Sequence, residues 1–208
     1  IHLVVKKNKI NTNASFYNFS SLPLKHNHVI FFLNYNVQLI YNDPRRFGYM
    51  KIIDSNFMKC PPLNRLGPDP FSSKFNITYI KNYIKNKKKN IKNLLMDQKF
   101  VSGLGNIYTN EILFSCRLNP NKNISDLSKK NIKEVIKNTK KILKKAILFG
   151  GSSIKDFKKI DGKSGNFQQK FMVYGKINKN CPRNNCEGVL KKIIIGNRSV
   201  FFCSLCQI

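Results

Sequence analysis

Short apolar runs separated by polar and turn-forming residues fill the first quarter of the chain. They cover Ile1–Val5, Val29–Leu33, Val37–Tyr41 and Gly48–Ile53. Runs of this length bounded by Asn, Ser and Pro are typical of β-strands, and Asn34-Tyr35-Asn36 has the composition of a hairpin turn. The pattern predicts that the chain begins with a β-sheet.

The spacing of apolar residues changes after residue 73. In one stretch they recur at three- and four-residue intervals, at Ile132, Val135, Ile136, Ile142, Leu143, Ala146 and Ile147. Lysines occupy most of the remaining positions and Gly150-Gly151 follows as a stop signal. This pattern predicts an amphipathic helix of about five turns whose apolar stripe faces the core. Shorter helices are expected over 91–96 and 106–116.

Four prolines and Gly67 lie within residues 60–70, so we expect an irregular linker and a domain boundary there. Beyond the long helix, Phe171–Tyr174, Leu190–Ile195 and Val200–Cys203 have the character of strands. A Gly-Asn pair between the last two predicts a tight hairpin turn that presents Arg198.

Two cysteine pairs surround this hairpin. Cys181 and Cys186 are separated by four residues, and Cys203 and Cys206 by two. Both spacings suit a tetrahedral zinc ion, and four thiolates leave no open position for a catalytic water. The sequence therefore predicts one structural zinc ion. Because the other two cysteines are isolated, a disulfide framework fits less well, and a reducing compartment is expected.

The chain is strongly basic. It carries 38 Lys and Arg against 10 Asp and Glu, a formal charge of +28, so a polyanionic partner such as nucleic acid is expected. A coding bias towards Lys, Asn and Ile would explain part of this charge. Trp is absent and no apolar stretch is long enough to span a bilayer, which disfavours a membrane role. We expect a cytoplasmic protein, bacterial or of an organelle-like compartment.

Two turns have the chemistry of DNA contact. Asp43-Pro44-Arg45-Arg46-Phe47-Gly48 joins two guanidinium groups to an aromatic ring that can wedge into a base stack. Gly103-Leu104-Gly105-Asn106 precedes a helix, where free backbone N–H groups form a ready phosphate site. Taken alone, the first would equally be a surface turn and the second a simple capping turn.

Together these motifs resemble the formamidopyrimidine-DNA glycosylases. The matching segments, in the order found in that family, are Asp43–Gly48, Leu66–Pro70, Leu95–Lys99, Gly103–Glu111, Asp161–Gly165, Val173–Gly175 and the cysteine hairpin. The resemblance implies an α+β multidomain fold: a partial N-terminal β-sandwich over 1–66, a helical helix-two-turn-helix domain over 67–165 and a zinc finger over 166–208.

The resemblance also implies an activity. The family excises oxidised purines, such as 8-oxoguanine and formamidopyrimidine, and cleaves the strand at the abasic site by β,δ-elimination. The expected partner is double-stranded DNA containing such lesions, bound by a monomer. The damaged base has to leave the stack, because its glycosidic carbon cannot be reached inside a duplex.

Site residues carry over by motif. Asn106 and Arg198 would hold the phosphates beside the extruded nucleotide, and Arg198 would also act catalytically in the elimination steps. Arg45 and Phe47 would enter the helix where the base has left, with Phe47 as the wedge.

Further DNA contacts are expected from His26 and Lys88. The segment 150–167 resembles the loop that covers the extruded base. The four cysteines of the hairpin would hold the structural zinc ion.

The chain departs from the family at its beginning. The family's nucleophile is an amino-terminal proline followed by a glutamate, and an early lysine also takes part. None of these has a counterpart here, and Val4-Val5-Lys6-Lys7 replaces the family's Gly-Met-Ser-Gly turn. We expect either a fragment that binds damaged DNA without the nucleophile or the product of a decaying gene. A zinc-ribbon nucleic-acid-binding protein without catalysis and the sister glycosylase for oxidised pyrimidines are the alternatives.

Overall fold

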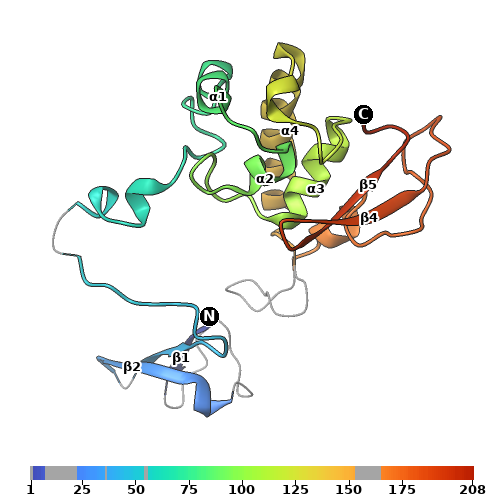
Figure 1. The fold of residues 1–208 in the computed structure, drawn as a ribbon. Helices are drawn as coiled ribbons and strands as arrows, with labels where there is room; N and C mark the ends of the chain where they lie inside the picture. Colours follow the sequence, from blue (N-terminus) through green and yellow to red (C-terminus); the bar gives the residue numbers. More distant parts are fainter. Residues whose placement is uncertain (1, 8–22, 36, 54–55, 153–164) are drawn as a thin grey trace. The chain divides into compact units, whose positions relative to one another are not determined.

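The computed structural model describes residues 2–7, 23–35, 37–53, 56–152 and 165–208. The chain forms two compact units (Figure 1). The first comprises Ile1–Asp54 and Leu148–Gln169, and the second comprises Ser55–Ile147 and Lys170–Ile208. The three-domain division expected from the sequence stays a prediction.

An antiparallel sheet forms the first unit. Its strands are β1 (His2–Lys7), β2 (Asn27–Leu33) and β3 (Val37–Asn42), in the order β1-β3-β2, and a short 3-10 turn, η1 (Leu24–His26), precedes β2. Leu33 pairs with Val37 across the turn that begins at Asn34. Three of the four predicted strands and the position of the hairpin are therefore confirmed, while residue 36 lies outside the described residues.

The predicted strand Gly48–Ile53 is wrong. Among the described residues this segment has no strand partner and no regular structure. The N–H of Gly48 donates instead to the Asp43 carboxylate at 2.8 Å, and the Ile52 side chain is 89% exposed. Strand propensity largely measures packing against neighbouring strands, so an apolar run without a neighbour does not form one.

Helices make up most of the second unit. They are α1 (Ile77–Ile84), α2 (Ile91–Met96), α3 (Asn106–Ser115) and α4 (Lys129–Leu148). Short 3-10 turns, η2 (Phe57–Lys59), η3 (Leu63–Arg65) and η4 (Ile124–Asp126), lie between or before them. The helices expected over 91–96 and 106–116 and the long amphipathic helix are confirmed.

Helix α1 was not predicted, although it carries a clear start signal. The side chain of Asn76 accepts the N–H of Tyr79 at 2.9 Å, and Asn90 caps α2 in the same way through the N–H of Asn93. Such caps satisfy N–H groups that the first helical turn leaves free. In so asparagine-rich a chain these two caps do not stand out from the other asparagines.

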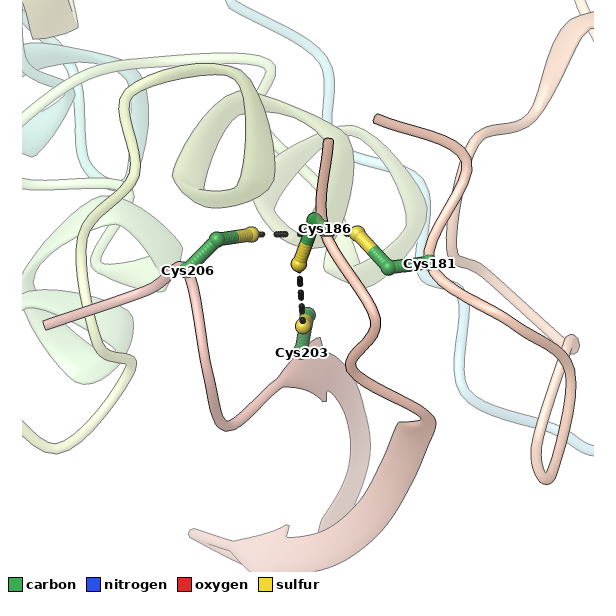
Figure 2. A group of neighbouring side chains, drawn as sticks. All are labelled: Cys181, Cys186, Cys203 and Cys206. Atoms are coloured by element: carbon green, nitrogen blue, oxygen red, sulfur yellow. Dashed lines mark hydrogen bonds between the residues drawn. The ribbon is translucent and has the colours of Figure 1, made fainter. Parts of the chain in front are cut away.

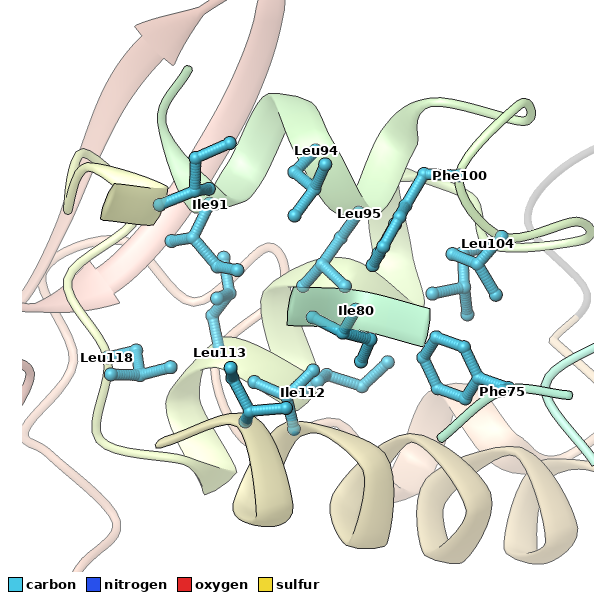
Figure 3. Packing of buried hydrophobic residues seen from close by; sticks show 14 residues of the cluster. Phe75, Ile80, Ile91, Leu94, Leu95, Phe100, Leu104, Ile112, Leu113 and Leu118 are labelled. Carbon is cyan, nitrogen blue, oxygen red and sulfur yellow. The ribbon is translucent and has the colours of Figure 1, made fainter. Parts of the chain in front are cut away.

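The four helices enclose one apolar core. Ile80 of α1, Leu95 of α2, Ile112 of α3 and Val135 of α4 are all buried within it, as is Phe100 (Figure 3). Burying each such side chain stabilises the fold by roughly 2 kcal/mol. The apolar stripe of α4 thus faces the core from Ile132 to Ala146, as its spacing predicts. Ile147, which the spacing also assigns to the stripe, is 66% exposed, so the prediction is wrong at this last position.

A two-stranded hairpin follows η5 (Phe167–Lys170). Its strands, β4 (Leu190–Ile195) and β5 (Arg198–Cys203), pair from Leu190↔Cys203 to Ile195↔Arg198. Gly196 and Asn197 form the turn with φ values of 56° and 58°, the backbone that a type I′ turn requires. The hairpin that presents Arg198 is confirmed.

A second small core joins this hairpin to α3. Phe114 of α3 packs with Val173, Leu190 and Phe201, all buried. The predicted strand over residues 171–174 is wrong, because this segment forms a turn. Its N–H groups are directed to a side chain of α3, described below, and are therefore not available to a neighbouring strand.

None of the helices in the described residues combines the length and the apolar character that crossing a membrane requires.

Candidate functional site

Four sulfur atoms converge beside the hairpin (Figure 2). The Sγ atoms of Cys181 and Cys206 lie 3.8 Å apart, those of Cys186 and Cys203 lie 3.7 Å apart, and all four lie within 4.8 Å of one another. Sulfurs at about 2.3 Å from a tetrahedral zinc ion are separated by about 3.8 Å. The four predicted ligands are thus brought together with the spacing that zinc needs.

The backbone around the sulfurs also suits a metal site. Burial raises the pKa of the Cys203 thiol, but hydrogen bonds from the N–H groups of Cys206 and Leu205 and from the thiols of Cys206 and Cys186 together lower the pKa to about 7. A methyl group added at Gly188 would lie 2.5 Å from Sγ of Cys203. The chain therefore passes so close to the sulfur cluster that only glycine fits at this position.

A second cluster centres on Asn106, the first residue of α3. Its Oδ1 accepts a hydrogen bond from Nζ of Lys92, and its Nδ2 donates to the carbonyl of Ser199 at 3.0 Å. Asn106 therefore connects α2 to strand β5 beside Arg198, which is exposed. The two residues that the resemblance assigns to phosphate binding, Asn106 and Arg198, lie on the same part of the second unit.

Lys92 was missed by the sequence analysis. Lys92 is only 1% exposed. Burial, together with the positive charge of Arg198, lowers the pKa of its amine from 10.5 to about 8. Such a shift marks a functional candidate, since buried lysines are rare without a role. The available signal was a lysine between Ile91 and Leu94 on a short apolar helix.

The tip of the hairpin contacts α2. A methyl group at Gly196 would lie 2.9 Å from Oδ1 of Asn93, so the turn passes close to the helix that carries Lys92. Deeper along the strand, the N–H of Phe201 donates to Oδ1 of Asn110 at 2.7 Å. Helices α2 and α3 together thus hold the strand that presents Arg198.

Glu111 joins α3 to the segment before the cysteine hairpin. Its buried carboxylate accepts the N–H groups of Met172, Val173 and Tyr174 at 2.7, 3.0 and 2.9 Å. Three N–H donors satisfy a buried charge that would otherwise be costly. From the sequence alone, Glu111 is part of a family motif without an assigned role.

The loop before α3 is fixed from two sides. Gln98 accepts the N–H of Gly103 at 2.8 Å and donates to the carbonyl of Leu104 at 2.8 Å. Gly67 packs against the same loop, where a methyl group would lie 2.4 Å from the carbonyl carbon of Phe100. Two of the matched motifs therefore support the start of α3, and the free N–H groups of a helix start favour an anion.

In the first unit, Asp43 organises the Arg-Arg-Phe turn. Its carboxylate accepts the N–H groups of Gly48 at 2.8 Å and Arg45 at 3.3 Å, and the bond from Gly48 lowers its pKa. The turn presents Phe47 to solvent, 79% exposed, with the Arg45 guanidinium 5.4 Å from the centre of its ring. Phe47 therefore projects outward and does not pack into the sheet.

The other two predicted DNA contacts, His26 and Lys88, belong to different units. The carbonyl of His26 accepts the N–H of Asp43 at 3.0 Å, so His26 adjoins the Arg-Arg-Phe turn. Lys88 is exposed between α1 and α2. The loop expected to cover the extruded base lies mostly outside the described residues, at 153–164. Its two ends meet, because Ser152 forms a β-bridge with Asn166.

Comparison with known proteins gives a consistent result. Residues 66–158 match the family described as "Formamidopyrimidine-DNA glycosylase H2TH domain". The chain is 43% identical to the formamidopyrimidine-DNA glycosylase of Histophilus somni over 183 residues, which is 88% of this chain and 67% of that protein. It is 38% identical to that of Roseobacter denitrificans, covering 89% of this chain and 66% of the relative. The chain thus spans about two thirds of the curated relatives' length.

Solved structures of formamidopyrimidine-DNA glycosylases are also similar to this chain. The MutM (Fpg) protein from Thermus thermophilus is 31% identical with a TM-score of 0.78, covering 89% of this chain and 70% of that one. The Lactococcus lactis Fpg in complex with DNA containing an abasic site is 29% identical with a TM-score of 0.80, covering 99% of this chain and 71% of that one.

Proposed function

The chain belongs to the formamidopyrimidine-DNA glycosylase family, and we propose that it binds damaged double-stranded DNA in base-excision repair, as the part of a glycosylase that holds the lesion. The relatives carry the name of an enzyme that acts on DNA, and the Lactococcus lactis Fpg binds DNA with an abasic site. In line with a DNA-repair role, we propose an intracellular location and a monomer.

The observation that carries this proposal is the cluster of Lys92, Asn106 and Arg198. Two positive charges and an amide lie beside the first turn of α3, where the helix dipole also favours an anion. A phosphate bound here would be neutralised on several sides. Since Lys92 is buried, we assign it the role of positioning Asn106, and we assign the direct phosphate contacts to Asn106 and Arg198.

The exposed turn at Arg45 and Phe47 suits the second requirement of the activity. An aromatic ring held away from the protein can enter the stack and occupy space that an extruded base leaves. The guanidinium next to it can donate to the unpaired base on the opposite strand. We assign these roles to Phe47 and Arg45, and additional backbone contacts to His26 and Lys88.

The four cysteines fit a zinc ion, and the ion would fix the hairpin without taking part in the chemistry. Four thiolates complete a tetrahedral shell, so no position remains for water or substrate. The hairpin in turn holds Arg198, which is the first residue of its second strand, β5. We propose one structural zinc ion per chain.

The finer activity follows the family. We propose oxidised purines as the substrate class, with Arg198 assisting β,δ-elimination at the abasic site. The covalent step needs an amine that attacks the sugar, and we assign that nucleophile to none of residues 1–208. The part of the activity that this chain itself carries is therefore lesion binding.

Binding to an abasic-site duplex tests the proposal. Wild type should bind with a strong salt dependence, and Arg198→Ala should lower the affinity about tenfold and reduce the salt slope by roughly one. Lys145→Ala, which removes one exposed charge from α4, is the matched control and should change the affinity less than about twofold.

The intact duplex separates the alternatives. A glycosylase-type lesion binder should prefer the abasic duplex over the same duplex without a lesion. Equal affinity for both would favour the zinc-ribbon alternative, a nucleic-acid-binding protein without lesion recognition. Equal binding by wild type and Arg198→Ala would remove Arg198 from the site.

A further inference from the structure

A groove lies between the start of α1 and the outer side of α4. Its volume is about 500 Å³. The apolar part of its lining is formed by Phe75, Ile77 and Ile136, and the basic part by Lys133, Lys137 and Lys140. Binding sites in proteins commonly have volumes of about 300 to 1,000 Å³. This groove is large enough for one large side chain and the backbone next to it.

All the charged side chains that line the groove are basic. The three lysines follow one another at four- and three-residue spacing along α4, so they form a single row on the helix surface. The carboxylate of Glu134 lies 4.0 Å from Nζ of Lys137, and the side chains of both residues are accessible to solvent. Across the described parts of the chain, no ion pair involves Lys133 or Lys140, and no acidic side chain lines the groove. The occupant that complements this surface is acidic.

The apolar lining distinguishes a peptide from a DNA backbone. Phosphates and sugars would be held by the lysines but would gain little from half-buried Ile77 and Ile136. A peptide offers both complements, because carboxylates can pair with the lysines while an apolar side chain covers the isoleucines. None of the residues lining the groove belongs to the cluster of Lys92, Asn106 and Arg198 or to the cysteine site.

We propose that this groove is a docking site for an acidic segment of a partner protein that inserts one apolar side chain between α1 and α4. The partner's carboxylates lie along the row of Lys133, Lys137 and Lys140, and its apolar side chain contacts Ile77 and Ile136. Charged residues along the rim set the rate and the specificity of such an encounter, and the buried side chain supplies the anchor. The site goes beyond lesion binding, since it serves to attach another protein.

Fluorescence anisotropy on the whole chain tests this. The probe is a short fluorescein-labelled peptide of Asp and Glu with one central Phe, added in the presence of saturating abasic-site duplex so that the DNA-binding surface is occupied. Wild type should bind the probe. The double variant Lys133→Glu with Lys140→Glu should weaken binding about tenfold or more.

Two controls make the result specific. Lys141→Glu with Lys145→Glu changes the net charge equally on the same helix, at two exposed positions that do not line the groove, and should alter peptide affinity less than about twofold. Replacing the central Phe of the probe by Ser should weaken binding to wild type about tenfold. Circular dichroism should show the same helix content for both protein variants.

Three outcomes would overturn the proposal. One is the absence of peptide binding once the duplex is bound. Another is equal loss of binding in the two double variants, which would mean attraction to net charge alone. The third is a selective loss of duplex affinity in the Lys133 and Lys140 variant, which would make the groove part of the DNA surface. None of these would affect the role of Arg198 in lesion binding.

Discussion

Lys92 of α2 donates a hydrogen bond to the side-chain oxygen of Asn106, the first residue of α3. Because Asn106 also donates to the carbonyl of Ser199, a single amide is held between two elements and has little rotational freedom. Its orientation is therefore set in the free chain, before the proposed binding of DNA. Such preorganisation lowers the entropic cost of binding.

The charge of Lys92 should make stability depend on pH. Its pKa is about 8 in the folded chain and 10.5 as a model value, so between these values the unfolded chain binds more protons and stability rises with pH. From about pH 7.5 to about pH 9.5 wild type should gain about 2 kcal/mol relative to Lys92→Met. Urea unfolding at the two pH values measures the difference. Lys88→Met, at an exposed position, is the control and should follow wild type.

Replacing Glu111 should loosen the turn at residues 172–174. Glu111→Gln puts an NH₂ group where an oxygen accepts backbone N–H groups, so at least one buried donor loses its partner. We expect a loss of about 2 to 4 kcal/mol in the free energy of unfolding. Glu134→Gln, on the outer side of α4, should cost less than about 0.5 kcal/mol. Similar unfolding curves for the two variants would contradict the role assigned to Glu111.

Metal binding can be checked directly. We expect one zinc ion per chain by atomic emission, and chelation should destabilise the hairpin because four thiolates lose their common partner. Gly188→Ala should lower the zinc content, since its methyl group would collide with Sγ of Cys203. The neighbouring Val189→Ala shortens a partly exposed side chain and should retain the metal. Full zinc occupancy in Gly188→Ala would show that the backbone there can move.

Two glycines near α3 should respond in opposite ways to alanine. Gly67→Ala places a methyl group 2.4 Å from backbone atoms of Phe100, so we expect a stability loss of about 2 kcal/mol or more. At Gly105 a methyl group meets no atom within 4 Å, so stability should hardly change. Its methyl group would instead stand where a phosphate approaches the helix start, and affinity for the abasic duplex should fall about tenfold. Thermal unfolding and duplex titration of both variants separate the two effects.

The sequence identified the elements that repeat a local pattern. The stripe from Ile132 to Ala146, the Gly-Asn turn before Arg198 and the four cysteines depend on spacing along the chain, and the structure has each of them. The apolar runs at Gly48–Ile53 and at residues 171–174 predict strands, and both predictions are wrong. Whether an apolar run becomes a strand depends on a neighbour that local sequence does not specify.

Tertiary structure alone decided which distant residues meet. Lys92 belongs to α2, Asn106 to α3 and Ser199 to β5, and nothing in their spacing places them in one hydrogen-bonded cluster. The same holds for Glu111 and the N–H groups of residues 172–174. The sequence determined the family motifs and the two cysteine pairs, because these need particular residue types at short range. Packing of α2, α3 and the hairpin around shared cores determined the buried lysine and the orientation of Asn106. Packing at the start of α1 and along α4 determined the groove.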